Sequence, residues 1–461
     1  MADNTVAPLT PEIVALSEYV ARAIDAPLPD AIARRTRQHL LDTLAAIVSG
    51  TRLAAGRLGA RYAAEIGGIG EALAIGCGQL VPAAQAALAN GLAGHADETD
   101  DSHLRGRFHP GCAIVPAALA VAERQDANGD ELLRAIALGY DVGVRINLAL
   151  GFSRPDMIRH STHSIGTAFG AAAAAASLLR LAPQQVRHVI SYTAQQASGI
   201  PFWQRDPYHV EKAFDFGGMP ARNGVSAAIM VAMGFGGVED PFGGRHNLFA
   251  SIGEAPRPEL VAQDLGARWE IADASIKKWC VGSPIQAVLD AVTAILGSRP
   301  TRPDEIAEIA ITMPDDRIHI VDDRAMPDVC VQHLAAIALL DGTVTFAAAH
   351  DHGRMADPDV RALRARMRLV PSPELTAAIP ARQAIVEIRT RGGETLRHHA
   401  SRVRGTPDNP MDQAEIEAKA RDLVDPILGP AGGAALVAMV AGLDAAIPAR
   451  VLRGPLAAAA L

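Results

Sequence analysis

The side chains best suited to chemistry gather in one short stretch, 95-HADETDDSHLRGRFHPG-111. It holds three histidines, three aspartates, a glutamate and two arginines, in a chain otherwise rich in Ala, Leu, Gly and Val. Imidazoles and carboxylates are the groups that most often move protons near neutral pH. Pro110 disfavours helical angles at His109, so we expect this imidazole to project from a turn.

Two other interpretations of this stretch remain open at the level of sequence. A metal ion would find enough ligands there, although their spacing matches no fixed motif such as HExxH. The candidate ligands are His95, Glu98, Asp101, His103 and His109. Alternatively, the stretch is a charged loop in water. Apolar helical segments flank it, which favours a position at the end of a helix.

A second cluster lies in 158-IRHSTHSIGTAFG-170, where His160 and His163 precede a Gly/Ala-rich segment. This composition predicts a tightly packed helix. The positive end of its dipole would face the polar residues and attract a carboxylate ligand. The simpler alternative is that Ser161 or Ser164 caps the helix and no ligand binds.

The third cluster is 211-EKAFDFGGMPARNGVSAAIM-230, in which Lys212 and Arg222 flank a Phe-Asp-Phe-Gly-Gly turn. We expect these glycines to let the backbone approach a ligand, although a lysine among apolar residues can also be a surface side chain. Taken together, the three clusters suit proton abstraction beside a carboxylate. In such a site cations hold the substrate anion while a base and an acid move protons.

The elements that must position these clusters are helical in the first half of the chain. Thr10 and Pro11 form a helix start signal, with a capping hydroxyl before a proline at the first helical position. Apolar residues recur at helical spacing in several further segments. These segments are 29–50, 81–95, 114–125, 130–150 and 183–198. No strand-like alternation of any length appears before about residue 265.

The pattern then changes to a mixture of strands and helices. Segments 306–314 and 384–393 alternate apolar and polar residues, as half-buried strands do. Helical patterns cover 331–342 and 358–370 between them, and return in 413–428 and 434–445 near the C-terminus.

The predicted fold class is therefore mainly α, with two domains. Residues 1–265 and 405–461 form a large all-helical domain built from both chain ends. Residues 266–404 form a smaller α+β lid domain.

Composition restricts the classes of partner. A formal net charge of −8 argues against nucleic acid, which requires a concentrated basic face. The four cysteines are far apart and form no CxxC pair, which indicates reduced thiols in a cytoplasm. The N-terminus lacks a basic region followed by an apolar run, so we expect no secretion signal. The longest apolar segment, 165–179, is shorter than the roughly 20 residues of a membrane-spanning helix, so no membrane association is expected.

Several of these motifs together resemble the MmgE/PrpD family. The motifs are 95-HADETDDSH-103, 109-HPG-111, His160 followed by GTAFGAA, Lys212 followed by RNG, 276-IKKWCVGSPIQAVLDA-291 and 408-DNPMDQAEIEAKARDLV-424. The resemblance runs nearly end to end. It implies a large helical domain with a smaller α+β lid, a homodimer, and no metal or organic cofactor. Family members include 2-methylcitrate dehydratases, cis-aconitate decarboxylases and iminodisuccinate epimerases.

The resemblance also implies roles for individual residues. The catalytic candidates are His109, His160, Lys212 and Glu98, the last standing where the family often has an aspartate. The substrate-binding candidates are Ser102, Asp101, His103, Arg107, Arg222, Gln286 and His333. Gln286 departs from the family pattern, which has a histidine at this position. An amide orients a substrate but does not transfer protons.

These roles predict a cofactor-independent lyase that acts on a hydroxy-polycarboxylate. Lys212, assisted by Arg222 or Arg107, would bind the substrate, and His160 or His109 would remove the α-proton. The other imidazole or a protonated Glu98 would protonate the departing hydroxyl. We predict a hydro-lyase similar to 2-methylcitrate dehydratase. An epimerase or a decarboxylase is the alternative, and a helical scaffold that merely binds an anion is the non-enzymatic one.

Overall fold

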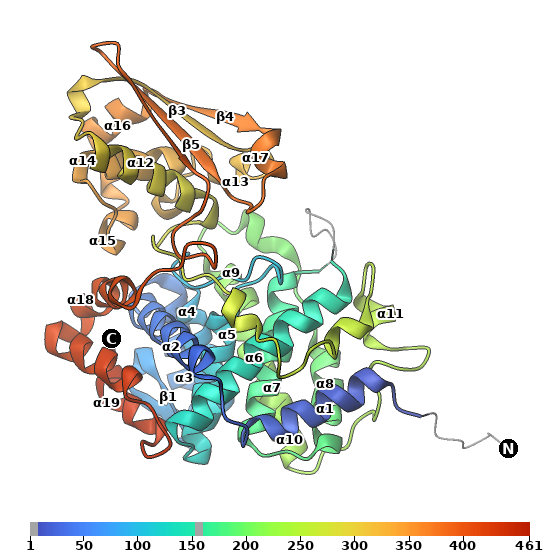
Figure 1. Cartoon of the computed structure of the whole chain (residues 1–461). Coiled ribbons are helices and arrows are strands. Elements are labelled where there is room, and N and C mark those ends of the chain that lie inside the picture. Colours follow the sequence, from blue (N-terminus) through green and yellow to red (C-terminus); the bar gives the residue numbers. More distant parts are fainter. Residues whose placement is uncertain (1–7, 153–159) are drawn as a thin grey trace. The chain divides into compact units, whose positions relative to one another are not determined.

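The computed structural model describes residues 8–152 and 160–461 (Figure 1). The start of the chain, where no secretion signal is expected, and residues 158 and 159 of the second cluster lie outside the described residues. Helices make up most of the described chain, so the predicted mainly α class is confirmed. Contacts divide the chain into two compact units. The first comprises Met1–Ala96, Asp100–Ala274 and Leu423–Leu461, and the second comprises Asp97–Thr99 and Ser275–Asp422.

The first unit is a set of packed helices with one short hairpin. Its helices are α1 (Pro11–Ala23), α2 (Asp30–Gly50), α3 (Ala54–Ile66), α4 (Ala83–Gly94), α5 (Gly111–Gln125), α6 (Gly129–Leu150), α7 (Thr162–Leu178), α8 (Pro183–Gln196), α9 (Val210–Ala213), α10 (Met219–Ala232), α11 (Leu248–Ile252) and α19 (Arg453–Ala457). The hairpin pairs β1 (Ala72–Ala74) with β2 (Gln79–Val81), and the sequence did not predict it. Three-residue strands are too short to show an alternating pattern.

Helix α7 lies at the centre of the first unit, and every one of its residues is buried. It packs against α5, α6, α8 and α10. Two glycine pairs bring α6 and α7 together: a Cβ on Gly143 would lie 2.6 Å from the carbonyl oxygen of Gly166, and one on Gly139 would lie 2.9 Å from that of Gly170. The Ala- and Gly-rich sequence thus produces the tightly packed helix that it predicts.

The second unit contains a four-stranded sheet in the order β4-β3-β5-β6. Its strands are β3 (Ile306–Pro314), β4 (Met367–Ser372), β5 (Ala384–Thr390) and β6 (Thr395–Ala400). Strand β4 runs parallel to β3, and the other pairs are antiparallel. Apolar residues of β3 and β5 form one core with the helices of this unit. The helices that contribute to this core are α12 (Gln286–Ser298), α13 (Ile318–Val321), α14 (Val331–Asp341), α15 (Phe346–Ala349) and α16 (Pro358–Arg364), and α17 (Pro373–Ala377) is the remaining short helix between β4 and β5.

Some local predictions were wrong. The segment 358–370, predicted to be one helix, ends its helix at Arg364 and continues as β4. Pairing of this edge strand with β3, which is distant in sequence, outweighs the local helix propensity. Thr10 does not cap α1 with its side chain. Its hydroxyl instead donates a hydrogen bond to Asp240, 3.1 Å away.

Helix α18 (Gln413–Ala441) is the only described helix long and apolar enough to cross a membrane by length and composition. It is interrupted at Gly429, whose φ of 72° and ψ of 161° are not helical, between Pro426 and Pro430. Each half is therefore shorter than the roughly 20 residues that a spanning helix needs.

Candidate active site

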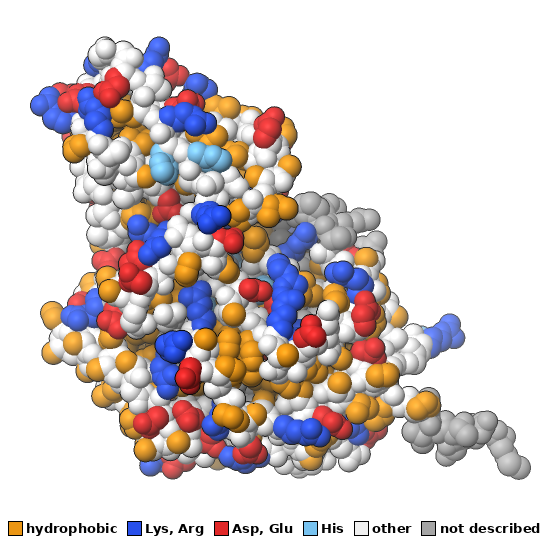
Figure 2. Space-filling view, viewed as in Figure 1, with side chains coloured by type: hydrophobic (Ala, Val, Ile, Leu, Met, Phe, Trp, Pro, Cys, Tyr) orange, Lys and Arg blue, Asp and Glu red, His pale blue; other side chains and the backbone are white. Residues whose placement is uncertain are grey.

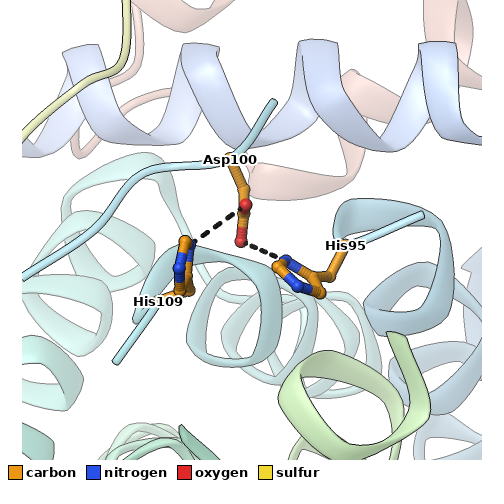
Figure 3. Close-up of side chains that lie close together, drawn as sticks. All are labelled: His95, Asp100 and His109. Carbon is orange, nitrogen blue, oxygen red and sulfur yellow. Dashed lines mark hydrogen bonds and ion pairs between the residues drawn. The ribbon is translucent and has the colours of Figure 1, made fainter. Parts of the chain in front are cut away.

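Asp100 connects two imidazoles in the first unit (Figure 3). Its Oδ2 atom is 2.9 Å from Nδ1 of His95, and its Oδ1 atom is 3.2 Å from Nδ1 of His109. His95 follows the last residue of α4 and His109 stands just before α5, and these two helices pack against each other. The contact between the helices thus sets the distance between the imidazoles. Asp100 and His95 are fully buried, while the His109 side chain is 11% exposed.

The charge of Asp100 is stabilised by its partners. Burial alone would raise the pKa of this carboxyl group, but the imidazoles of His95 and His109 outweigh burial and hold the pKa well below its usual range. Asp100 is therefore a carboxylate at neutral pH. A carboxylate facing Nδ1 of an imidazole fixes the tautomer and leaves Nε2 as the basic nitrogen.

Phe216 is the aromatic centre around which the histidines gather. The His163 ring stacks on it with a centroid distance of 3.8 Å, and the His95 ring stacks at 4.4 Å. His109 lies 5.6 Å from the same ring, and His209 contacts His95 at 5.2 Å. We call His95, His109, His163 and His209 the histidine cluster.

Lys212 brings a positive charge to the same aromatic centre. Its Nζ atom lies 5.3 Å from the centroid of the Phe216 ring and 5.6 Å from that of Trp203. An ammonium group over an aromatic face is attracted by the ring quadrupole, which orients the side chain. The interpretation of Lys212 as a mere surface side chain does not account for this position.

The segment that carries Phe216 is a π-helical turn, Phe214–Gly218, between α9 and α10. Its glycines contact helix α4. A Cβ on Gly217 would lie 2.2 Å from the carbonyl oxygen of Gly91. The prediction that these glycines let the backbone approach a ligand was therefore wrong. They let α4 approach instead, which brings Phe216 against His95 at the end of α4.

Asp215 is a second buried carboxyl group beside the histidine cluster. Burial raises its pKa to about 6, although hydrogen bonds from Ser161 and Ser164 oppose this shift. The hydroxyl of Ser161 donates to Asp215 over 2.5 Å, and neither serine makes a capping hydrogen bond to α7. The helix-capping interpretation of the second cluster was therefore wrong.

Most of the opening stretch is buried, which contradicts its interpretation as a solvated loop. Asp101 and His103 have zero and 1% exposure. Asp101 accepts hydrogen bonds from His39 and Tyr140, while His103 accepts one from the backbone N–H of Gly106. Both side chains thus bind protein groups that hold the stretch in place.

The arginines predicted to bind substrate are not in contact with the histidine cluster among the described interactions. Arg222 bonds to Asn223 and lines an apolar groove of about 1290 Å³ on the first unit. Arg107 is exposed and, with Arg105 and Arg257, lines a separate cavity of about 610 Å³. Within the predicted set, the structure therefore brings His109 and Lys212 to one centre, but not these two arginines.

Two other predicted residues of the first unit, His160 and Ser102, are close in sequence to residues of the site. His160 is half-buried directly before Ser161, and the described ring contacts of the cluster involve His163 instead. Ser102 is buried between Asp101 and His103. Catalysis by His160 and substrate binding by Ser102 stay predictions.

Glu98 belongs to the second unit and is buried there with Lys277. The Nζ atom of Lys277 donates to the carbonyl oxygen of Glu98 over 2.7 Å and lies 3.5 Å from its Oε2. Proton donation by Glu98 stays a prediction.

The two neighbours of Glu98 are also held by buried cations of the second unit. Asp97 forms an ion pair of 2.8 Å with His350, and the carbonyl oxygen of Thr99 accepts a hydrogen bond of 3.0 Å from Lys419. Burial lowers the pKa of His350, but Asp97 outweighs it and raises that pKa to about 9. His350 is thus an imidazolium at neutral pH.

Gln286 and His333 have roles inside the second unit. The Gln286 amide accepts from the N–H of Trp279 and donates to the carbonyl oxygens of Trp279 and Val281, which fully engages it with backbone. His333 is fully buried on α14, and burial together with nearby arginines lowers its pKa to about 4. Neither of its ring nitrogens has a hydrogen-bond partner among the described residues. We therefore leave both residues out of the site.

Sequence reasoning missed several residues of the site. The sequence gives no role to Asp100, Phe216 or His163, and it suggests His95 only as a possible metal ligand. Their signal is weak because residues from four segments meet only through helix packing. Within the second unit, Lys277 contacts Glu98 and lies in the motif 276–291, but no role was predicted for it from the sequence.

One group within the described part of the first unit has the geometry to hold a metal ion. Ligand atoms of His95, Asp100 and His109 all lie within 4.8 Å of one another. Two imidazoles and a carboxylate would suit Zn²⁺, with a fourth position to be filled. The same distances are accounted for by direct pairing of Asp100 with the two imidazoles.

Comparison with known proteins agrees with the sequence motifs. Residues 14–261 match the MmgE/PrpD N-terminal domain and residues 279–445 match the MmgE/PrpD C-terminal domain. The chain is also similar to the human cis-aconitate decarboxylase, with 24% identity over 457 residues, which cover 93% of this chain and 92% of the relative. The relative is an enzyme, and the two matched domains together span most of the chain. The chain belongs to the MmgE/PrpD family.

Proposed function

We propose that this protein is a cofactor-independent lyase that removes a proton beside a carboxylate of a hydroxy-polycarboxylate. The observation that carries this proposal is the pairing of His109 with the ionised Asp100 around the ring that also orients the Lys212 ammonium. A base held in one tautomer beside a cation is the combination that α-proton abstraction requires. We further propose a homodimer, as the family resemblance implies, located in the cytoplasm, as the four cysteines, far apart in the sequence, suggest.

In the proposed mechanism His109 is the base. Its Nδ1 atom faces Asp100, so Nε2 accepts the proton, and the carboxylate stabilises the imidazolium that forms. The Lys212 ammonium binds a substrate carboxylate and stabilises the negative charge that develops on it as the C–H bond breaks. His160, from the family pattern, supplies the proton to the departing hydroxyl. Glu98, whose Oε2 lies 3.5 Å from Nζ of Lys277, is the alternative proton donor.

Water loss is the first candidate reaction, and decarboxylation is the second. The second is supported by the similarity to human cis-aconitate decarboxylase along nearly the whole length of both chains. Both reactions pass through negative charge beside a carboxylate, so the same cation serves either one. In dehydration His109 removes a proton, whereas in decarboxylation CO2 leaves and a protonated imidazole supplies a proton to the carbanion. An epimerase would share the first step and return the proton to the opposite face.

The test is proton NMR in D2O with 2-methylcitrate, cis-aconitate and iminodisuccinate offered separately. Olefinic signals from 2-methylcitrate indicate dehydration, a shortened carbon skeleton from cis-aconitate indicates decarboxylation, and deuterium at an α-carbon without net conversion indicates epimerisation. Binding of these acids without any of the three changes would support the anion-binding scaffold and contradict the proposal.

Substitutions test the assignment of residues. We expect Lys212→Met and His109→Asn to lower turnover about 10²- to 10⁴-fold, as the loss of a proton-transfer or charge-stabilising group does. Arg222→Met is the matched control, because it removes a cation of the neighbouring helix that lines the apolar groove. Full turnover by Lys212→Met and His109→Asn would contradict the proposed site.

A further inference from the structure

Next to Asp100, a second aspartate faces a different set of partners. Asp101 is fully buried and accepts three hydrogen bonds. Its Oδ2 atom is 2.6 Å from the hydroxyl of Tyr140 and 2.7 Å from Nδ1 of His39, and its Oδ1 atom accepts from the N–H of Gly111 over 2.9 Å. Helix α2 supplies His39 and helix α6 supplies Tyr140, so two core helices grip one carboxylate.

The hydrogen bond from the N–H of Gly111 to Asp101 joins the two ends of the segment 101–111 and makes it a closed loop. Asp100 immediately precedes the closed segment, and His109 lies within it, two residues before Gly111. Gly111 fits this position because a Cβ there would lie 2.9 Å from both the Asp101 carboxylate and the Tyr140 hydroxyl. The positions of Asp100 and His109 therefore depend on the same anchor.

We infer that Tyr140 and His39 are positioning residues for the proton-transfer pair: by fixing Asp101 they hold the carboxylate of Asp100 against Nδ1 of His109. The inference rests on the proposed function of that pair. Proton transfer is sensitive to such placement, because a displacement of about 1 Å in a catalytic group costs up to about 10²-fold in rate.

The protonation states of the network suit a rigid anchor. Burial is outweighed by His39 and Tyr140, which lower the pKa of Asp101, so this group is a carboxylate at neutral pH. Burial and the nearby Arg35 lower the pKa of His39 to about 4, against the pull of Asp101. His39 is therefore neutral and donates through Nδ1, so the anchor keeps one arrangement across the pH range of enzyme assays.

Tyr140→Phe tests the inference with a minimal change. It removes one hydroxyl and leaves Asp101 with two donors. We expect kcat to fall about tenfold with KM nearly unchanged, because substrate binding by Lys212 is not altered. The ¹³C carboxyl resonance of Asp100 should titrate at a higher pH than in the wild type, because the carboxylate is less closely paired with His95 and His109.

Thr43→Val is the matched control. The Thr43 hydroxyl lies in the same core, 2.5 Å from where a Cβ on Gly111 would be, and has no hydrogen-bond partner among the described residues. We expect this variant to keep both the wild-type kcat and the Asp100 titration. A purely structural Tyr140 would lower the folded fraction without moving the Asp100 titration, and that result would overturn the inference.

A second pair of variants covers the case in which Tyr140→Phe does not fold. His39→Asn keeps an N–H near the place of Nδ1, and His39→Leu removes it. The inference predicts that Asn preserves the Asp100 titration and Leu shifts it, and equal behaviour of the two would contradict it. Because the NMR titration needs no substrate, it tests the anchor even if 2-methylcitrate and cis-aconitate are not turned over, which would refute the proposed function alone.

Discussion

The imidazole of His163 lies flat on the ring of Phe216, with 9° between the two planes. The edge of Trp203 meets the same imidazole at a centroid distance of 5.6 Å. A histidine enclosed by two aromatic rings contributes packing area and shape, as an aromatic residue would. We interpret His163 as a packing residue beside His109, whose ring centroid is 5.5 Å away. Proton transfer is proposed for His109 and His160.

Substitutions at His163 separate these roles. His163→Phe preserves the stack and should keep activity within about threefold of the wild type, whereas His163→Ala leaves a void beside Phe216 and should lower activity and stability, the latter by about 2–4 kcal/mol. Steady-state kinetics and urea unfolding measure both effects. An inactive but folded His163→Phe, with an active His160→Asn, would show that His163 and not His160 transfers the proton.

The raised pKa of Asp215 predicts that replacing this residue with Asn stabilises the protein at high pH. Its folded pKa of about 6 lies above the ordinary value of 3.8, so its contribution is fully present below pH 3.8 and is lost as the pH rises through 6. Keeping this carboxylate buried and ionised at pH 8 costs about 3 kcal/mol at most. We expect Asp215→Asn, which can still accept from Ser161, to be more stable than the wild type at pH 8 and equally stable near pH 4. Urea unfolding at the two pH values measures this, and no gain at pH 8 would contradict it.

The ion pair between His350 and Asp97 predicts that replacing His350 destabilises the protein at low pH and has less effect at high pH. The folded pKa of His350, about 9, exceeds the ordinary value of 6.5, so its stabilisation is fully present below pH 6.5 and is lost as the pH rises through 9. His350→Gln should reduce the free energy of unfolding by about 2–3 kcal/mol at pH 6.5. The difference from the wild type should shrink by pH 10. A difference that does not change with pH would show that the imidazole is neutral in the folded protein.

We expect substitution of Gln286 to lower the stability of the folded protein. Gln286→Leu removes the amide's hydrogen bonds to the Trp279 N–H and to the Trp279 and Val281 carbonyl oxygens, which should cost about 2–4 kcal/mol. Gln332→Leu is the control, because this half-buried amide bonds near the surface to Asp322 and Asp323 and should cost less than about 1 kcal/mol. Thermal unfolding of both variants measures the difference. A Gln286→Leu protein of unchanged stability and lost turnover would restore the substrate-binding role.

The periodicity of apolar residues predicted several elements correctly where the pattern lies within one continuous segment. The helix predicted over 29–50 is α2, and the buried Ala-rich segment is α7. The strand predicted over 306–314 is β3, with the same bounds. Strand β4 was missed because its residues are arranged by pairing with β3, a contact that is distant in sequence.

The site was only partly predictable for a related reason. His109 and Lys212 carry motifs that can be read locally, and both side chains lie near the Phe216 ring. The role of Asp100 could not be separated from that of Asp101 by sequence, because adjacent carboxylates differ only in which helices they face. Likewise Gly217 looked like a ligand-binding residue until its contact with Gly91 was known.

The grip of Lys277, His350 and Lys419 on residues 97–99 has a practical consequence for dissecting the protein. A polypeptide cut out as 275–422 would contain all three side chains but would lack the Asp97 carboxylate, the Glu98 carboxylate and carbonyl oxygen, and the Thr99 carbonyl oxygen. Removing one partner of a buried charge is destabilising. The second unit therefore depends on a tripeptide that lies far from residues 275–422 in the sequence. Grafting this unit into another scaffold would require a short peptide bearing Asp-Glu-Thr to be supplied from elsewhere in the recipient's sequence.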